Sequence, residues 1–542
     1  MRCKPLSLLA ISTLARALHR EGMTRGATRP CAVFLLAFFA CLFAARAHAA
    51  WGFEQVAALA KARAATAFRP ADTTMPAELA ALDYDGLRDI RFKPGRALWH
   101  DGALPFEAMF FHRGRYHPEP VRIHEVDAGG TVRDVPWRAA DYDYGANKVA
   151  TQGWPDLGHA GFRVHYPLNG PGYKDELIVF LGASYFRALG AGQQYGLSAR
   201  ALAVDTVGAN GPEEFPRFTD FWLERPEPGA TRLVLHALLD SPRAAGAYQF
   251  TITPGAQTTV QVRARLFLRA SDRPIATLGL APLTSMFLFG ENQPRAGDFR
   301  PEVHDSDGLL MASASGEWLW RPLQNPRELL VTSFAFDGLR GFGLMQRDRA
   351  FASYEDTEAR YDRRPSAWIR PIGDWGPGRV ELVQLSTPDE THDNVVAYWV
   401  PARLPAPGEP FDYAYELAWQ GDDQQRPPAG WATQSRRGVG YVRAEQAPQS
   451  AGLVQYVVDF SGPALAALGA DAPVRAIASS DGNGRLEQPL AWFNPATRSW
   501  RVVLRVRPVD PSRPVELRAF LQHGNDIVSE TWTNIVLPDT AP

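Results

Sequence analysis

Apolar and polar side chains alternate along most of this chain, and the alternation predicts β-strands. The clearest stretch is Thr259–Arg269, whose apolar side chains at every second position are Val260, Val262, Ala264, Leu266 and Leu268. The side chains that point the other way are Gln261, Arg263, Arg265 and Arg269. A period of two indicates a strand with one buried and one wet face. Pro254-Gly255 joins this stretch to Tyr248–Thr253, which predicts a hairpin. Antiparallel sheets of this kind pack face to face as sandwiches.

Helical periodicity is scarce, and a helix is expected only over residues 53–65, near the start of the mature chain. Residues 422–430 are polar and proline-rich with nothing to bury, so we interpret them as a linker. Residues 50–421 are then expected to form a large β-sandwich. Residues 431–542 hold short alternating strands typical of an immunoglobulin-like sandwich, over residues 453–460, 500–506 and 515–521.

The amino terminus has the organisation of a secretory signal peptide. An apolar run, Cys31–Ala45, follows Arg25 and Arg29 and precedes the small-residue pattern Ala47-His48-Ala49. The run is shorter than the roughly 20 residues of a membrane span, which disfavours an uncleaved anchor. We therefore assign residues 1–49 to the signal region, with Met23 as an alternative start, and expect the mature protein to be exported.

Composition narrows the function of the mature protein. The cysteines, Cys3, Cys31 and Cys41, all lie in the signal region, which excludes disulfides, thiol nucleophiles and cysteine metal sites from the mature chain. The signal region also holds seven basic residues and one acidic residue. Its removal leaves 50 basic and 58 acidic residues, a net charge near −8. Because no basic stripe remains, nucleic acid is not an expected partner, and a neutral substrate such as a sugar polymer fits better.

Aromatic and acidic residues gather between about residues 284 and 400, which makes this the candidate region for chemistry. Trp318 and Trp320 lie two apart, so they would share one face of a strand. Indole rings suit the apolar faces of sugar rings, and we predict a substrate-binding role for both. Core packing is the alternative, and the pattern favours neither.

Two short runs place carboxylates in turn-like surroundings. His304-Asp305-Ser306-Asp307-Gly308 is one, and Thr391-His392-Asp393-Asn394 is the other. Neither completes a calcium loop, so no metal is predicted, although local turn capping remains an alternative. Glycoside hydrolysis uses two carboxyl groups across the bond, which makes the runs candidates for catalysis. Nucleotide, phosphate-loop, serine-elbow and zinc motifs are missing from the sequence, and no cofactor is expected.

Several long strings resemble one known family, the periplasmic glucans biosynthesis proteins of the G type, which are related to the D type. These strings are Leu181–Arg187, Tyr195–Arg200, Glu213–Phe218, Leu239–Arg243 and Pro282–Phe287, together with the runs around Asp305, Trp318 and Asp393. The resemblance covers nearly the whole mature chain. It implies a large galactose-mutarotase-like β-sandwich, a linker and a small immunoglobulin-like domain. The arginines of the leader are separated, unlike the twin-arginine leaders of the D type, which favours the G type.

The resemblance also implies a role in making osmoregulated periplasmic glucans, whose backbone is β-1,2-linked glucose. Members of the family are similar to inverting β-1,2-glucanases. In that comparison Asp393 matches the general acid and Asp305 the proposed base, while Tyr361 and Arg364 match residues that line the path between them. The alternatives are a non-catalytic glucan-binding or assembly factor that works with an inner-membrane glucan synthase, and a mutarotase-like epimerase. A homodimer is also consistent with the family.

An acid at Asp393 would have to stay protonated near neutral pH, although aspartate ordinarily has a pKa of about 3.9. Burial against Trp399, or the nearby charges of Asp389 and Glu390, is the source that the sequence suggests for a raised pKa.

Overall fold

The computed structural model describes residues 51–208, 211–439 and 452–538. The predicted signal region, its cleavage site and the alternative start at Met23 lie outside the described residues. Within those residues, no helix is both long enough and apolar enough to cross a membrane. Strands dominate, which confirms the all-β prediction. The described α-helices are α3 (Phe53–Ala64), α4 (Ala77–Ala80), α5 (Tyr84–Asp89) and α6 (Pro463–Ala466).

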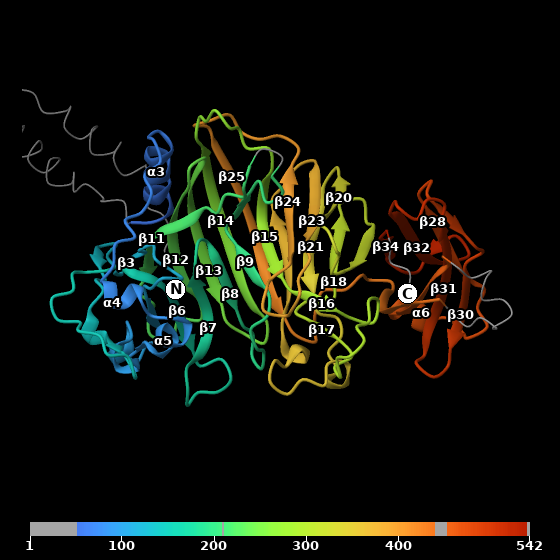
Figure 1. The fold of residues 1–542 in the computed structure, drawn as a ribbon, viewed down its shortest axis with the longest axis horizontal. Helices are drawn as coiled ribbons and strands as arrows, with labels where there is room; N and C mark the ends of the chain where they lie inside the picture. Colours follow the sequence, from blue (N-terminus) through green and yellow to red (C-terminus); the bar gives the residue numbers. More distant parts are fainter. Residues whose placement is uncertain (1–50, 209–210, 440–451, 539–542) are drawn as a thin grey trace, which may run out of the picture. The chain divides into compact units, whose positions relative to one another are not determined.

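The first large sheet has ten strands. Its order is β2 (Glu107–His112), β6 (His159–Tyr166), β7 (Asp175–Leu181), β8 (Tyr185–Ala188), β9 (Ser198–Arg200), β15 (Leu278–Ser285), β24 (Val395–Pro401), β23 (Gly378–Gln384) and β20 (Leu330–Phe336), with β10 (Leu202–Val204) also paired to β15. Strands β15, β24 and β23 lie side by side in the middle of the fold (Figure 1). The inward side chains of the sheet are almost all apolar, so this face forms one half of the main core.

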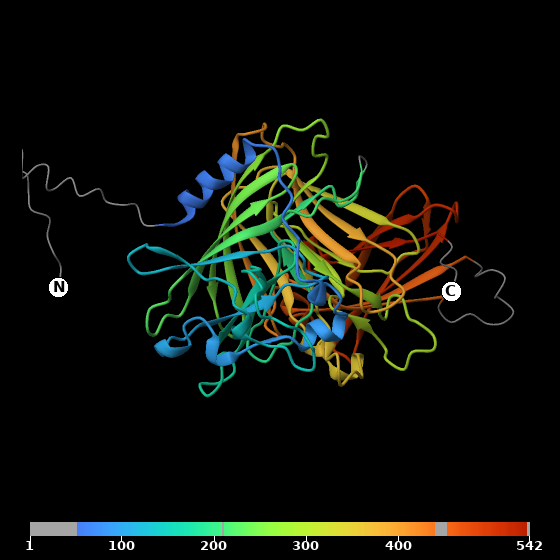
Figure 2. The same ribbon diagram turned by 60° about the vertical axis from the view of Figure 1, so that its left-hand side comes forward.

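The second large sheet has fifteen strands and supplies the other half of that core. Its order is β28 (Val474–Ser480), β32 (Val515–His523), β34 (Thr531–Val536), β19 (Trp318–Pro322), β18 (Gly308–Ser313), β21 (Leu339–Met345), β22 (Ser366–Ile372), β25 (Pro410–Gln420), β14 (Thr258–Leu268), β13 (Ala244–Thr253), β12 (Leu233–Asp240), β11 (Arg217–Glu224), β3 (Arg122–Val126) and β4 (Val132–Asp134), with β33 (Asp526–Ile527) paired to β32. One continuous apolar cluster contains side chains of both sheets, as in a β-sandwich. Figure 2 shows the strands from a second side, with α3 outside them.

The predicted hairpin is present as β13 and β14, which pair antiparallel over ten residue pairs. The outer face of β14 is not simply wet, however, because α3 lies across it. Phe53 of the helix packs under the guanidinium of Arg263, 3.8 Å from its carbon to the ring centre. Glu54 pairs with Arg263 at 2.8 Å and with Arg265 at 2.9 Å. Arg263 and Arg265, which suggested a solvated face, therefore hold α3 against the sheet.

The carboxyl-terminal residues form a second, smaller pair of layers. Four of its strands, β28, β32, β33 and β34, extend the fifteen-stranded sheet through the parallel pairing of β34 with β19. The facing five-stranded sheet is β26 (Trp431–Gly438), β27 (Val454–Ser461), β31 (Ser499–Pro508) and β29 (Gly484–Leu486), with β30 (Leu490–Asn494) paired to β31. An apolar cluster fills the space between them. The division at residues 422–430 stays a prediction; this segment runs between β25 and β26, and its Gln424 is buried against Ser366.

Polar contacts fasten this smaller region to the large sandwich. Arg347 donates two hydrogen bonds to Glu530, at 2.7 and 2.9 Å, and both side chains are buried. The carboxylate of Glu291 accepts a hydrogen bond from the backbone of Ser435 at 2.8 Å. Two small sheets complete the fold: β1 (Arg91–Phe92) with β5 (Tyr142–Asp143), and β16 (Phe287–Phe289) with β17 (Val303–His304).

Candidate functional site

Asp393 lies two residues before the start of β24, beside a cleft of about 660 Å³. The cleft is open to solvent and its wall mixes aromatic rings with charged groups, as expected of a site for a polar ligand with apolar faces. Besides Asp393, the side chains that give the wall this character are Phe111, Tyr116, His117, Glu119, Arg163, Glu176, Tyr185, Arg187, Tyr195 and Arg217.

Asn394 holds the Asp393 loop in place. Its side chain is 1% exposed; its amide nitrogen donates to the carbonyls of Phe287 (3.0 Å) and Leu385 (2.9 Å), and its oxygen accepts from the Phe287 backbone (2.8 Å). The Asn394 backbone also donates to Ser285 at 3.0 Å. One residue away from both contacts, the carbonyl of Met286 accepts the backbone N–H of Asp305 at 2.8 Å. A single short segment, 285–287, therefore positions both predicted catalytic carboxylates.

Asp305 follows β17 and is 5% exposed. Its carboxylate forms an ion pair with Arg364, whose guanidinium also lies 4.2 Å from the ring centre of Tyr361. Tyr361 begins a 3₁₀ turn, is 1% exposed and packs on Tyr354. The Arg364 stem lies so close to Gly196 that a Cβ there would approach Arg364 Cβ to 2.9 Å, so only glycine fits without a shift. The structure thus brings together Asp305, Tyr361 and Arg364.

The two carboxyls interact through their charges. Desolvation raises the pKa of Asp393 above its ordinary value, and the negative charge of Asp305 adds to that increase, while Arg187 opposes it. Burial also raises the pKa of Asp305, opposed chiefly by its ion pair with Arg364. Asp305 is not among the described residues that line the cleft, whereas Arg187 lines it and its charge lowers the pKa of both carboxyls.

Burial, one of the two sources that the sequence suggested, is the main cause of the raised pKa of Asp393. The charge that adds to it is that of Asp305, which is distant in sequence. Trp399 is fully buried in the main core. Glu390 pairs with Arg300 at 2.7 Å, and Asp389 accepts hydrogen bonds from Thr391.

Trp318 and Trp320 lie away from the cleft, on β19. Trp320 is 4% exposed, and the guanidinium of Arg347 lies 3.6 Å from its ring centre. Trp318 stacks on Trp368 at 5.8 Å, and both tryptophans of the pair contact the apolar cluster of the smaller region. These contacts favour the core-packing alternative, most clearly for the buried Trp320, and substrate binding by the two indoles stays a prediction.

Several cleft residues were missed as functional candidates. Tyr185, Arg187 and Tyr195 lie inside strings that carried the family resemblance, and that location was the available signal. Tyr185 and Arg187 belong to β8, which pairs with β9 and places Tyr185 opposite Arg200. As for the calcium alternative, the described residues contain no group of three or more histidine, cysteine or acidic side chains arranged to hold a metal.

Comparison with known proteins identifies the family. The family model described as "Periplasmic glucan biosynthesis protein, MdoG" matches residues 51–535. The chain belongs to this family. It is 52% identical over 501 residues to glucans biosynthesis protein G of Ralstonia nicotianae, covering 92% of this chain and 98% of that protein. The protein of the same name from Pseudomonas paraeruginosa is 47% identical, covering 89% and 92%, and that from Pectobacterium atrosepticum is 44% identical, covering 91% and 95%.

Membership establishes a periplasmic protein of glucan biosynthesis. Among solved structures, the Slr1438 protein from Synechocystis sp. PCC 6803 matches with a TM-score of 0.21 and 8% identity, covering 48% of this chain and 91% of that one.

Proposed function

We propose that this protein is an inverting glucanase that shortens or trims β-1,2-linked glucan during synthesis, with Asp393 as general acid and Asp305 as base. The observation that carries the proposal is a carboxyl with a raised pKa on the wall of an aromatic cleft, within electrostatic reach of a second, arginine-paired carboxyl. Two carboxyls of unlike environment are what acid–base cleavage of a glycosidic bond requires.

In this reaction the proton of Asp393 passes to the glycosidic oxygen as the bond to the anomeric carbon breaks. A water molecule attacks that carbon from the opposite face, and its proton passes to Asp305. Arg364 favours the ionised form of Asp305, which a base needs. Burial raises the pKa of Tyr361, so its hydroxyl keeps its proton and can take part in a relay between water and base.

Product analysis tests this proposal. The protein, produced with its own leader and purified from the periplasm, is incubated with linear β-1,2-glucan beside Asp393→Asn and Asp305→Asn. We expect the wild type to shorten the chain and both variants to bind it without cleavage. Binding without cleavage by the wild type would instead support the assembly-factor function, in which the same cleft holds polymer from the inner-membrane synthase. The synthase and homodimer partners remain predictions.

A further inference from the structure

Arg200 is a buried cation behind the cleft wall. Its side chain is 3% exposed and its Nη1 pairs with Glu213 Oε1 at 2.8 Å. The guanidinium carbon lies 5.3 Å from the ring centre of Tyr185 and 5.6 Å from that of Phe215, so the cation is enclosed by two aromatic rings. A buried cation with one carboxylate partner is a charge-balanced pair, and removing either member leaves the other uncompensated.

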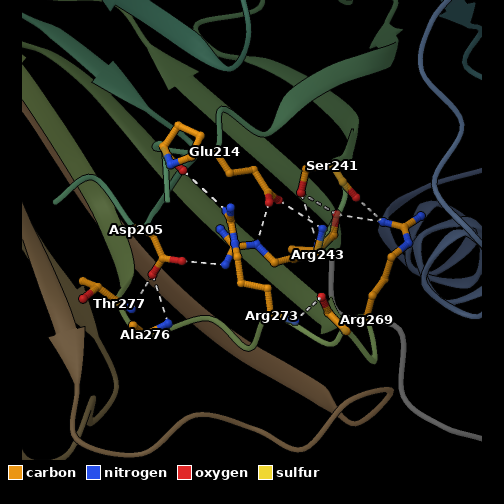
Figure 3. A network of polar contacts seen from close by, with 11 residues as sticks. Asp205, Glu214, Ser241, Arg243, Arg269, Arg273, Ala276 and Thr277 are labelled. Carbon is orange, nitrogen blue, oxygen red and sulfur yellow. Dashed lines mark hydrogen bonds and ion pairs between the residues drawn. The ribbon is translucent and has the colours of Figure 1, made fainter. Parts of the chain in front are cut away.

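The residue after Glu213 belongs to a second, buried network (Figure 3). Arg243 donates to Glu214 at 2.7 Å and to Asp205 at 2.5 Å. Asp205 in turn accepts the backbone N–H groups of Ala276 and Thr277 at 2.9 and 2.8 Å. Because the neighbouring Glu214 is held in this way, Glu213 has a defined place on Arg200.

The pair adjoins the predicted acid. Tyr185 lies opposite Arg200 in the β8–β9 ladder and lines the same cleft as Asp393. Strand β15 pairs with β9 on one side and with β24, which Asp393 precedes, on the other. Arg200 and Asp393 therefore come from strands separated by one strand of the same sheet.

We propose that Glu213 is a positioning residue that helps Asp393 to hold its proton, because it compensates the charge of Arg200, a cation that would otherwise favour the ionised acid more strongly. The inference rests on the proposed role of Asp393 as acid. Neither residue need touch the substrate. Arg200 differs from Arg187 in being buried and paired with a carboxylate, the half-buried Glu213, since Arg187 is exposed and donates to the neutral Ser198.

Other charged groups lie near Asp393, and their effects on its pKa have to be distinguished from the effect of the Arg200–Glu213 pair. Those from other elements are Arg187, Asp305 and Arg364, and those on its own loop are Asp389, Glu390 and His392. Glu390 is bound to Arg300, and Asp389 lies 3.1 Å from His392. The Coulomb effect of Arg200 lowers the pKa of Asp393 and ranks after those of Arg187 and Asp305, so its removal should be measurable without abolishing the site.

Two substitutions with opposite signs test the proposal. Glu213→Gln frees the charge of Arg200, so the alkaline limb of the pH–activity profile on β-1,2-glucan should move down by about 0.5 pH unit. Arg200→Met keeps the packing between the rings and removes the cation, so the limb should move up by about the same amount. The double variant should return towards the wild type. As a matched control, Glu416→Gln breaks the remote Arg370–Glu416 pair, 2.9 Å long, and should move nothing.

A readout that needs no turnover separates this proposal from the proposed function. The Asp393 carboxyl is titrated by ¹³C NMR in protein labelled at aspartate, with its signal assigned by its loss in Asp393→Asn. Opposite shifts in the two variants support the pair even if no glucan is cleaved. Unchanged titration, or shifts of the same sign in both variants, would overturn it.

Discussion

Replacing Asn394 by alanine is the sharpest test of how the fold positions the two carboxyls. The substitution removes three hydrogen bonds, two of them to the buried N–H and C=O of Phe287 and one to the carbonyl of Leu385. A buried polar group left without a partner costs about 1–3 kcal/mol, so we expect a loss of about 3 kcal/mol in the free energy of unfolding. The Ser285–Phe287 segment should then relax, and with it Asp393 and Asp305.

The movement of the Ser285–Phe287 segment should reduce kcat as well as stability, and the two effects can be measured separately. A misplacement of about 1 Å can cost about 100-fold in rate, so kcat on β-1,2-glucan should fall at least tenfold in Asn394→Ala under conditions where the protein is folded. Urea denaturation gives the stability and reducing-end release gives the rate.

Asn483→Ala is the matched control for this experiment. Asn483 is also buried, and its amide donates to three carbonyls, of Asp510, Arg513 and Pro514, in the smaller region. It should lose similar stability and keep the wild-type kcat. If Asn394→Ala, Asn483→Ala and the wild type all have the same kcat, Asn394 does not position the two carboxyls, whatever the stabilities of the variants.

Two further predictions concern residues outside the cleft. Trp320→Ala should lower the free energy of unfolding by about 3 kcal/mol or more and leave glucan affinity unchanged, and weaker binding by calorimetry would support Trp320 as a substrate residue. Burial and the neighbouring Glu302 raise the pKa of Glu291 to about 8, from an ordinary value of about 4.3. A group whose pKa is higher in the folded state stabilises fully below its unfolded pKa and loses that contribution as pH rises through the folded value. The urea concentration at the midpoint of unfolding should therefore decrease as the pH rises from about 5 to about 8, and it should decrease less in Glu291→Gln. The same decrease in both proteins would contradict this assignment.

Strand patterns predicted much of the large sandwich because alternation is a local property. The stretch Thr259–Arg269 became β14 almost residue for residue, and the turn at Pro254 and Gly255 was placed correctly. What alternation cannot show is which partner covers a face. The arginines of β14 lie under α3, and the two indoles of β19 lie under the smaller region, because contacts between residues about 200 positions apart decide burial.

The candidate site also combines residues that the sequence named with contacts that only the structure shows. Asp305, Tyr361 and Arg364 were named through family resemblance, and the structure joins them around one ion pair. The sequence did not predict the hydrogen bonds by which Asn394 holds the Asp393 loop, nor the ion pair of Arg200 with Glu213. Each depends on which strands lie side by side in the ten-stranded sheet, and no spacing within the sequence states that order.

The central claim is that Asp393 and Asp305 act on opposite sides of a β-1,2 bond, and the anomer released first tests it most directly. Fresh products from linear β-1,2-glucan are followed by ¹H NMR before they equilibrate. Attack by water opposite the leaving group predicts that the new reducing end appears as the α-anomer. A first product in the β configuration would contradict the assignment of Asp305 as base, and intact polymer after prolonged incubation would contradict the glucanase function itself.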